Sequence, residues 1–122
     1  MPHKIPFLDN SCATQVKVYR EKLKPIMNEW GDATDLASKA SRLSIVPQVA
    51  NLQALKRKLD TIEPGACVAT AHTSLSMSMN EEIEGFLSFI AQEADGTVSG
   101  HMQLANMYGK MAANKLDIAA NQ

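Results

Sequence analysis

The 122-residue sequence contains few aromatic residues: one Trp, two Tyr and three Phe. Its hydrophobic residues are mainly Leu, Ile, Val, Ala and seven Met. This composition favours helices over sheets, because strands are enriched in aromatic and β-branched side chains. A chain of this length suits one domain with a core of its own, so the sequence predicts a single all-α domain.

The sequence also lacks an excess of positive charge, with 12 basic and 13 acidic residues. Nucleic-acid binding requires a basic surface that neutralises phosphates, so no nucleic-acid partner is expected. The densest basic clusters, at residues 17–24 and 56–58, are interpreted as solvated helix faces. No apolar run approaches the roughly 20 residues that cross a bilayer, so no membrane span is expected.

Motifs for catalysis, metal binding and cofactor attachment are missing as well. The sequence has no glycine-rich phosphate loop and no C-x-x-C-H motif for haem attachment. Neither His72 nor His101 follows a glutamate by three residues, which is the spacing of ligands in di-iron bundles. We interpret His72 as a core histidine, whereas His3 lies in the lead-in. The chain is therefore not expected to be an enzyme, and no catalytic residue, metal ligand or cofactor is assigned.

The strongest pattern in the sequence is an apolar seam in its first third. The seam alternates steps of four and three residues, which is typical of a helix in a bundle. Its positions are Cys12, Val16, Tyr19, Leu23, Ile26, Trp30, Ala33, Ala37 and Ala40. Asn10 or Ser11 is expected to cap this helix. Pro25 removes one backbone hydrogen bond, so it predicts a kink or short break near residues 22–24.

Two further helices follow a break at residues 41–44. Ser44 is expected to cap the second helix, with Pro47 in its first turn and Pro64-Gly65 at its end. Its apolar positions are Ile45, Val49, Leu52, Leu55, Leu59 and Ile62. The third helix is expected to begin near Ala66 and Cys67. Its apolar positions are Val68, His72, Leu75, Met79, Ile83, Phe86, Ile90 and Ala94.

Two features of the third helix need separate interpretation. Residues 73–79 alternate Ser with Met or Leu, which indicates a face of small residues where another helix packs closely. Glu81 and Glu84 belong to an acidic cluster in the middle of this helix, and we interpret them as facing solvent.

The turn-forming sequence Asp95-Gly96-Thr97 separates the third helix from a last helical stretch. Apolar positions in that stretch are Val98, Met102, Ala105, Ala112, Leu116 and Ala119. We therefore predict an antiparallel up-down-up-down bundle of four helices. The alternative is three helices, with a last helix of about 50 residues and about 75 Å. The bundle is expected at 11–119, after an irregular lead-in at 1–10 and before a C-terminal tail at 120–122.

The two cysteines are expected to meet in such a bundle. Cys12 and Cys67 both lie where a helix starts, and the first and third helices start at the same end. Neighbouring helices can bring two Cα atoms within the roughly 7 Å that a disulfide needs. Two free buried thiols, or half of a metal site, are the alternatives. A tilt of the first helix at Pro25 would separate the sulfur atoms.

A disulfide would indicate an oxidising compartment, so we predict a secreted, periplasmic or surface-anchored protein. Residues 1–10 lack the apolar segment of an intact signal peptide, and any leader is expected to be absent from this sequence.

Short motifs of packing residues extend from about Tyr19 to Gln92. They are Trp30-x-x-Ala33, Ala37-Ser38, Arg42, Leu52-Gln53-x-Leu55-Lys56-Arg57, Pro64-x-x-Cys67, His72-x-x-Leu75 and Met79-x-x-x-Ile83-x-Gly85-Phe86-Leu87-x-Phe89. In these motifs the chain resembles small extracytoplasmic helical proteins of environmental bacteria, which often carry a signal or lipoprotein leader. The resemblance implies an exported chain with Cys67 as a structural half-cystine, and it implies no particular activity.

Two functional hypotheses follow from the sequence. The first is a non-enzymatic, exported structural or protein-interaction bundle that binds a partner protein or a second copy of itself. The alternative is a bundle that binds a small molecule or a cofactor such as haem between its helices. Methionines that could contribute to such a site are Met27, Met77, Met79, Met102, Met107 and Met111.

Overall fold

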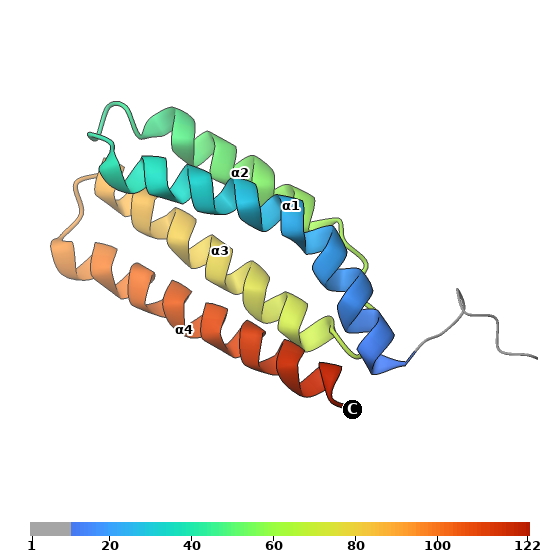
Figure 1. Cartoon of the computed structure of the whole chain (residues 1–122). Helices are drawn as coiled ribbons and strands as arrows, with labels where there is room; N and C mark the ends of the chain where they lie inside the picture. The colour runs from blue at the N-terminus through green and yellow to red at the C-terminus, as the bar shows by residue number, and fades with distance from the viewer. Residues whose placement is uncertain (1–10) are drawn as a thin grey trace, which may run out of the picture.

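The computed structural model describes residues 11–122 and contains four α-helices packed as an antiparallel bundle (Figure 1). The helices are α1 (Cys12–Lys39), α2 (Val46–Asp60), α3 (Ala69–Ile90) and α4 (Asp95–Ala120). Each helix packs against its neighbour in the chain, and α1 also packs against α4. The four-helix prediction is confirmed, and the alternative of one long last helix is wrong. The lead-in, with His3, lies outside the described residues.

The seam predicted in the first third of the chain is the buried face of α1. Its buried positions are Val16, Tyr19, Ile26, Trp30, Ala33 and Ala37. Ser11 caps the helix, because its side chain accepts a hydrogen bond from the backbone N–H of Thr14. Of the kink or short break predicted near residues 22–24, the break does not occur, since α1 is continuous through Pro25. Figure 1 shows instead that α1 bends in its blue, N-terminal half.

The limits of α2 and the start of α3 differ from the prediction. The N-cap of α2 is Ile45, because the hydroxyl of Ser44 is bonded within the preceding turn, to the backbone N–H and the hydroxyl of Ser41. Pro47 lies in the first turn, as expected. The helix ends at Asp60, four residues before Pro64, and α3 begins two residues after Cys67. The predicted apolar positions from Val49 to Leu59 are nevertheless buried.

Small residues bring α3 and α4 close together. The Ser78 hydroxyl is buried and donates a hydrogen bond of 2.6 Å to the carbonyl oxygen of Ala105. A Cβ atom at Gly109 would lie 3.3 Å from the Ser78 Oγ, and one at Gly85 would lie 2.6 Å from the Met102 Cε. A larger side chain at Gly109 would therefore press against Ser78, whereas one at Gly85 would displace the flexible end of Met102. The predicted close packing of another helix on the Ser-rich face of α3 is confirmed.

The turn between α3 and α4 lies at residues 91–94, earlier in the chain than Asp95-Gly96-Thr97. Gln92 has a φ of 59°, the left-handed conformation that often ends a helix. Its backbone N–H donates to the carbonyl of Phe89, and the N–H of Glu93 donates to that of Ser88. These two hydrogen bonds satisfy carbonyl groups at the end of α3. Asp95, expected in the turn, is the first residue of α4, and Gly96 lies within that helix.

Replacing Gln92 with glycine is expected to raise the free energy of unfolding by about 0.5–1 kcal/mol, because glycine adopts positive φ without the steric cost of a Cβ atom. Urea unfolding followed by circular dichroism measures the change. Gln103→Gly is the matched control, since exposed Gln103 lies within α4 and glycine there should cost about 1 kcal/mol. Equal destabilisation by both substitutions would contradict the role assigned to Gln92.

Candidate functional site

The disulfide joins the start of α1 to the turn that precedes α3. Cys12 and Cys67 are bonded, and their Cα atoms are 5.4 Å apart. Cys67 was predicted to lie in the first turn of α3, but it lies in the turn that precedes this helix. Its backbone N–H donates to the side-chain oxygen of Gln15, and Gly65 makes this turn with a φ of 75°. The bend of α1 thus does not separate the two sulfur atoms, which remain bonded.

His72 lies beside Tyr19 at the same end of the bundle. Its Nδ1 atom is 2.8 Å from the Tyr19 hydroxyl, and the two rings meet edge to face. Burial raises the pKa of Tyr19 to about 12, and it lowers the pKa of His72 despite the nearby charge of Asp60. The pair is thus a neutral hydrogen bond at neutral pH. His72 therefore has the hydrogen-bond partner expected of a core histidine, although its side chain is only partly buried.

His101 lies near the start of α4, at the opposite end of the bundle from His72. Its Nδ1 atom is 2.7 Å from a carboxylate oxygen of Glu81 on α3, and both side chains are mostly buried. The prediction that Glu81 faces solvent is therefore wrong, and Glu84 is also only partly exposed. Sequence reasoning missed the contact between Glu81 and His101, because it depends on the register between α3 and α4.

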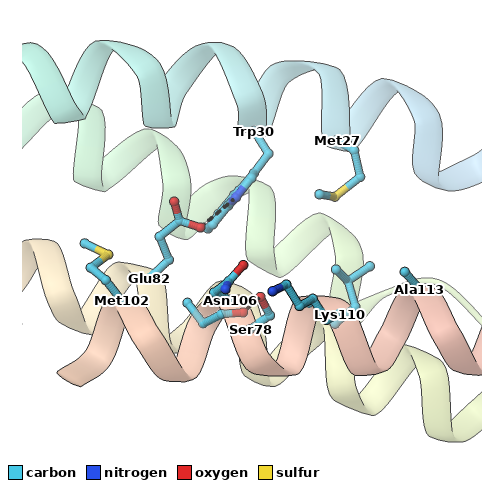
Figure 2. A pocket seen from close by; sticks show the side chains of 11 residues that line it. Met27, Trp30, Ser78, Glu82, Met102, Asn106, Lys110 and Ala113 are labelled. Carbon is cyan, nitrogen blue, oxygen red and sulfur yellow. Dashed lines mark hydrogen bonds between the residues drawn. The ribbon is translucent and has the colours of Figure 1, made fainter. Parts of the chain in front are cut away.

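A groove of about 590 Å³ lies between α1 and α4, over α3 (Figure 2). Its lining is Met27, Trp30, Leu75, Ser78, Glu82, Met102, Ala105, Asn106, Gly109, Lys110 and Ala113. Trp30 Nε1 donates a 3.3 Å hydrogen bond to the Glu82 carboxylate. Burial raises the pKa of Glu82, and this hydrogen bond opposes the effect only in part. Of the histidines within residues 11–122, neither His72 nor His101 lines the groove.

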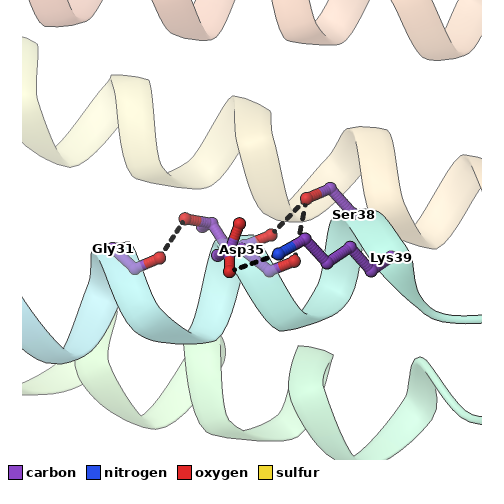
Figure 3. A network of polar contacts seen from close by, with 5 residues as sticks. Gly31, Asp35, Ser38 and Lys39 are labelled. Carbon is purple, nitrogen blue, oxygen red and sulfur yellow. Dashed lines mark hydrogen bonds and ion pairs between the residues drawn. The ribbon is translucent and has the colours of Figure 1, made fainter.

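Polar side chains near the end of α1 bond to their own helix. The Thr34 hydroxyl donates to the Gly31 carbonyl, the Ser38 hydroxyl donates to the carbonyls of Thr34 and Asp35, and Lys39 pairs with Asp35 at 3.0 Å (Figure 3). All of these contacts join residues three or four positions apart. They stabilise the last turns of α1.

A second apolar stripe runs along the exposed side of α4. It consists of Leu104, Met107, Met111 and Ile118, whose exposed fractions are 39%, 46%, 38% and 54%. The buried residues of this helix are Ala105, Ala112, Leu116 and Ala119, which were predicted from the sequence. The exposed stripe lies on a different face of the helix, and apolar periodicity alone does not separate it from the buried one. An exposed apolar stripe of this kind is typical of an interaction surface.

The remaining predicted features are dispersed. Lysine and arginine at residues 17–24 and 57–58 are exposed, and their ion pairs are Arg20–Asp117 and Lys58–Glu29. Lys56, which was predicted to be solvated with residues 57–58, is partly buried and pairs with Asp60 at 2.8 Å. Within residues 11–122, no three His, Cys, Asp or Glu side chains gather as metal ligands. In the same part of the chain, no helix combines the length and hydrophobicity of a bilayer span.

The fold and the cysteine pair define an antiparallel four-helix bundle with one intrachain disulfide. Protein-family models, curated proteins and solved structures all give no match to this chain.

Proposed function

We propose that the protein is an exported, non-enzymatic interaction protein that pairs with a second copy of itself through the exposed stripe of α4. The observation that carries this proposal is the stripe of Leu104, Met107, Met111 and Ile118. These positions are exposed in the single chain, although their apolar surface would be more stable when removed from water.

The spacing of the stripe favours another helix as its occupant. From Leu104 the positions advance by three, four, three and four residues through Met107, Met111 and Asn114 to Ile118. This is the repeat by which one helix packs its side chains between those of a second helix. Methionine suits such a contact, because its flexible thioether side chain adapts to the opposing surface.

Asn114 favours a parallel pairing of two identical helices. In a parallel two-fold arrangement, each stripe residue faces its own copy, so the two Asn114 amides can hydrogen-bond to each other. A polar residue at one seam position sets register and oligomeric state in this way. In an antiparallel pairing centred on Met111, Asn114 would face Met107 of the second copy and its buried amide would have no partner, which is costly.

The size of the stripe indicates a reversible dimer. Residues 104–118 extend about 22 Å along the helix, so the buried area is below the roughly 1,200 Å² of stable interfaces. Lys110 and Lys115 flank the seam on its two sides, and Lys115 Nζ donates a 2.9 Å hydrogen bond to the Ser74 hydroxyl of α3.

Export is supported by the disulfide between Cys12 and Cys67. Intrachain disulfides persist in oxidising compartments and are rare in reducing ones. Thiol titration of freshly purified protein tests this part of the proposal. No reactive thiol should be found with or without denaturant, and two reactive thiols in the unreduced protein would remove the argument.

Sedimentation velocity over about 5–500 μM protein tests the pairing. We expect a shift from one to two chains, with a dissociation constant of about 10–100 μM for an interface of this size. Met111→Glu should leave only monomer, because it places two carboxylates face to face. Asn114→Leu should strengthen the dimer.

Leu36→Glu is the matched control, since Leu36 is an apolar residue of α1 with an exposed fraction of 55%. It should dimerise like the original protein. Circular dichroism should show that every variant is folded, because each changed side chain is exposed in the single chain. A protein that remains monomeric at all concentrations, or a Met111→Glu variant that dimerises normally, would overturn the proposal.

A further inference from the structure

The groove between α1 and α4 combines an apolar wall with one half-buried carboxylate. Met27 and Trp30 line it from α1, Leu75 from α3 and Met102 from α4, while Glu82 projects into it from α3 (Figure 2). A concave apolar site with a few convergent polar groups is the usual form of a small-molecule site. The groove does not use the four apolar residues of the exposed stripe, and Lys110 both lines the groove and flanks the stripe.

Glu82 is the charged group that decides which ligand the groove suits. One carboxylate oxygen accepts the hydrogen bond from Trp30 Nε1. Within residues 11–122, Glu82 has no other hydrogen bond and no ion pair with Lys, Arg or His. Glu81, its neighbour, differs because it is paired with His101. A partly desolvated carboxylate with one neutral donor leaves negative charge that a cation would neutralise.

We propose that this groove binds a small organic ammonium ion with an apolar chain. The ammonium group contacts the free carboxylate oxygen of Glu82, and the chain lies along Trp30, Met27 and Leu75. The indole and thioether groups are polarizable and suit both an alkyl chain and a nearby positive charge. Charge complementarity at Glu82, together with this apolar wall, selects the ligand class.

Lys110 is the other ionisable group that lines the groove, and it favours the opposite sign of ligand. Its side chain is exposed, whereas Glu82 is half-buried. An exposed ammonium group is already well hydrated and gains little from an anion. Because the Glu82 carboxylate is the less hydrated of the two charges, a cation gains more from binding in the groove than an anion. Repulsion from Lys110 should weaken the binding of this cation.

Three compounds with the same six-carbon chain test the proposal: hexylammonium, hexanol and hexanoate. Trp30 is the only tryptophan of the chain, so its fluorescence reports directly on the groove. Isothermal titration calorimetry gives the affinities independently. We expect hexylammonium to bind with a dissociation constant of about 1 mM, as suits so small a ligand. Hexanol should bind about tenfold more weakly because it lacks the charged hydrogen bond, and hexanoate should bind least.

Variants locate the binding to the carboxylate. Glu82→Gln keeps an oxygen acceptor for Trp30 and should remove the preference for hexylammonium over hexanol. Glu84→Gln, on the same helix but outside the groove lining, should bind like the original protein. Lys110→Met should strengthen hexylammonium binding about threefold or more, as removal of a nearby like charge predicts.

The pH dependence has a defined sign. Binding needs the ionised Glu82, whose pKa is raised, so affinity should fall during mild acidification, above the pH at which exposed carboxyl groups take up protons. The proposal is overturned if hexanoate binds tightest, if the three compounds bind equally or not at all, or if Glu82→Gln binds hexylammonium unchanged.

Discussion

Replacing Cys12 and Cys67 together with serine is expected to lower the free energy of unfolding by about 4 kcal/mol. The disulfide joins residues separated by 55 positions, so its loss gives the unfolded chain considerable conformational freedom. It also releases the start of α1 from the turn before α3, where Cys67 N–H bonds to Gln15. Urea unfolding at constant pH, followed by circular dichroism, measures the difference.

Reduction of the original protein provides the control for the double variant. Dithiothreitol should produce a similar loss of stability, and it should have no effect on the variant. The helices should form in both cases, because the four-helix core contains Leu52, Leu59 and other buried side chains that do not depend on the bridge. A loss below about 1 kcal/mol would contradict the stabilising role of the disulfide, since removal of a native disulfide usually costs more.

Ser78→Leu is expected to lower the free energy of unfolding by about 3 kcal/mol. The larger side chain would enter the contact where the Ser78 Oγ lies 2.6 Å from the Ala105 carbonyl oxygen and where Gly109 leaves little space. The substitution removes this hydrogen bond and forces α3 and α4 apart. The Trp30 environment should change as well, because Ser78 and Trp30 line the same groove.

Thr73→Leu separates this steric effect from the general effect of adding an apolar side chain to α3. Thr73 is exposed on the same helix, so its substitution should change stability by less than about 0.5 kcal/mol. Thermal unfolding of the two variants under the same conditions makes the comparison. If Ser78→Leu is tolerated as well as Thr73→Leu, then close packing of small residues does not hold α3 against α4.

Much of this fold follows from local patterns in the sequence. The alternating steps from Val16 to Ala37 identify the buried face of α1, because side chains at this spacing lie on one side of a helix. The same reasoning identifies the core of α2. The pairing of Cys12 with Cys67 follows from topology, since two antiparallel helices return the third to the end where the first began.

The turn after α3 could not be placed by composition alone. Gln92 adopts a left-handed conformation, which is more common for glycine. The sequence therefore predicts the turn at Gly96, four residues later. The chain turns at Gln92 because the two hydrogen bonds to Phe89 and Ser88 satisfy the end of α3 there. Gly96 has no neighbouring atom close to its Cβ position, and no tight contact requires it to be glycine.

The candidate surfaces were harder to predict, because they depend on the relative placement of helices. Glu81 and Glu82 are adjacent in sequence, yet one contacts His101 of α4 and the other contacts Trp30 of α1. On α4, the exposed stripe and the buried stripe are both apolar, and periodicity alone does not show which one faces the bundle. The small buried residues, such as Ala105 and Ala112, fit the close contact with α3.

Cross-linking of an Asn114→Cys chain tests the proposed parallel pairing most directly. Facing seam positions in parallel helices lie close enough for a disulfide, which needs a Cα separation of about 4.4–6.8 Å. At a protein concentration above the dissociation constant, mild oxidation should convert this variant to covalent dimers, while Cys12 and Cys67 remain paired. The absence of covalent dimers would contradict the proposed pairing. So would a mixture of Asn114→Cys and Met107→Cys chains that cross-links to each other faster than Asn114→Cys chains cross-link among themselves.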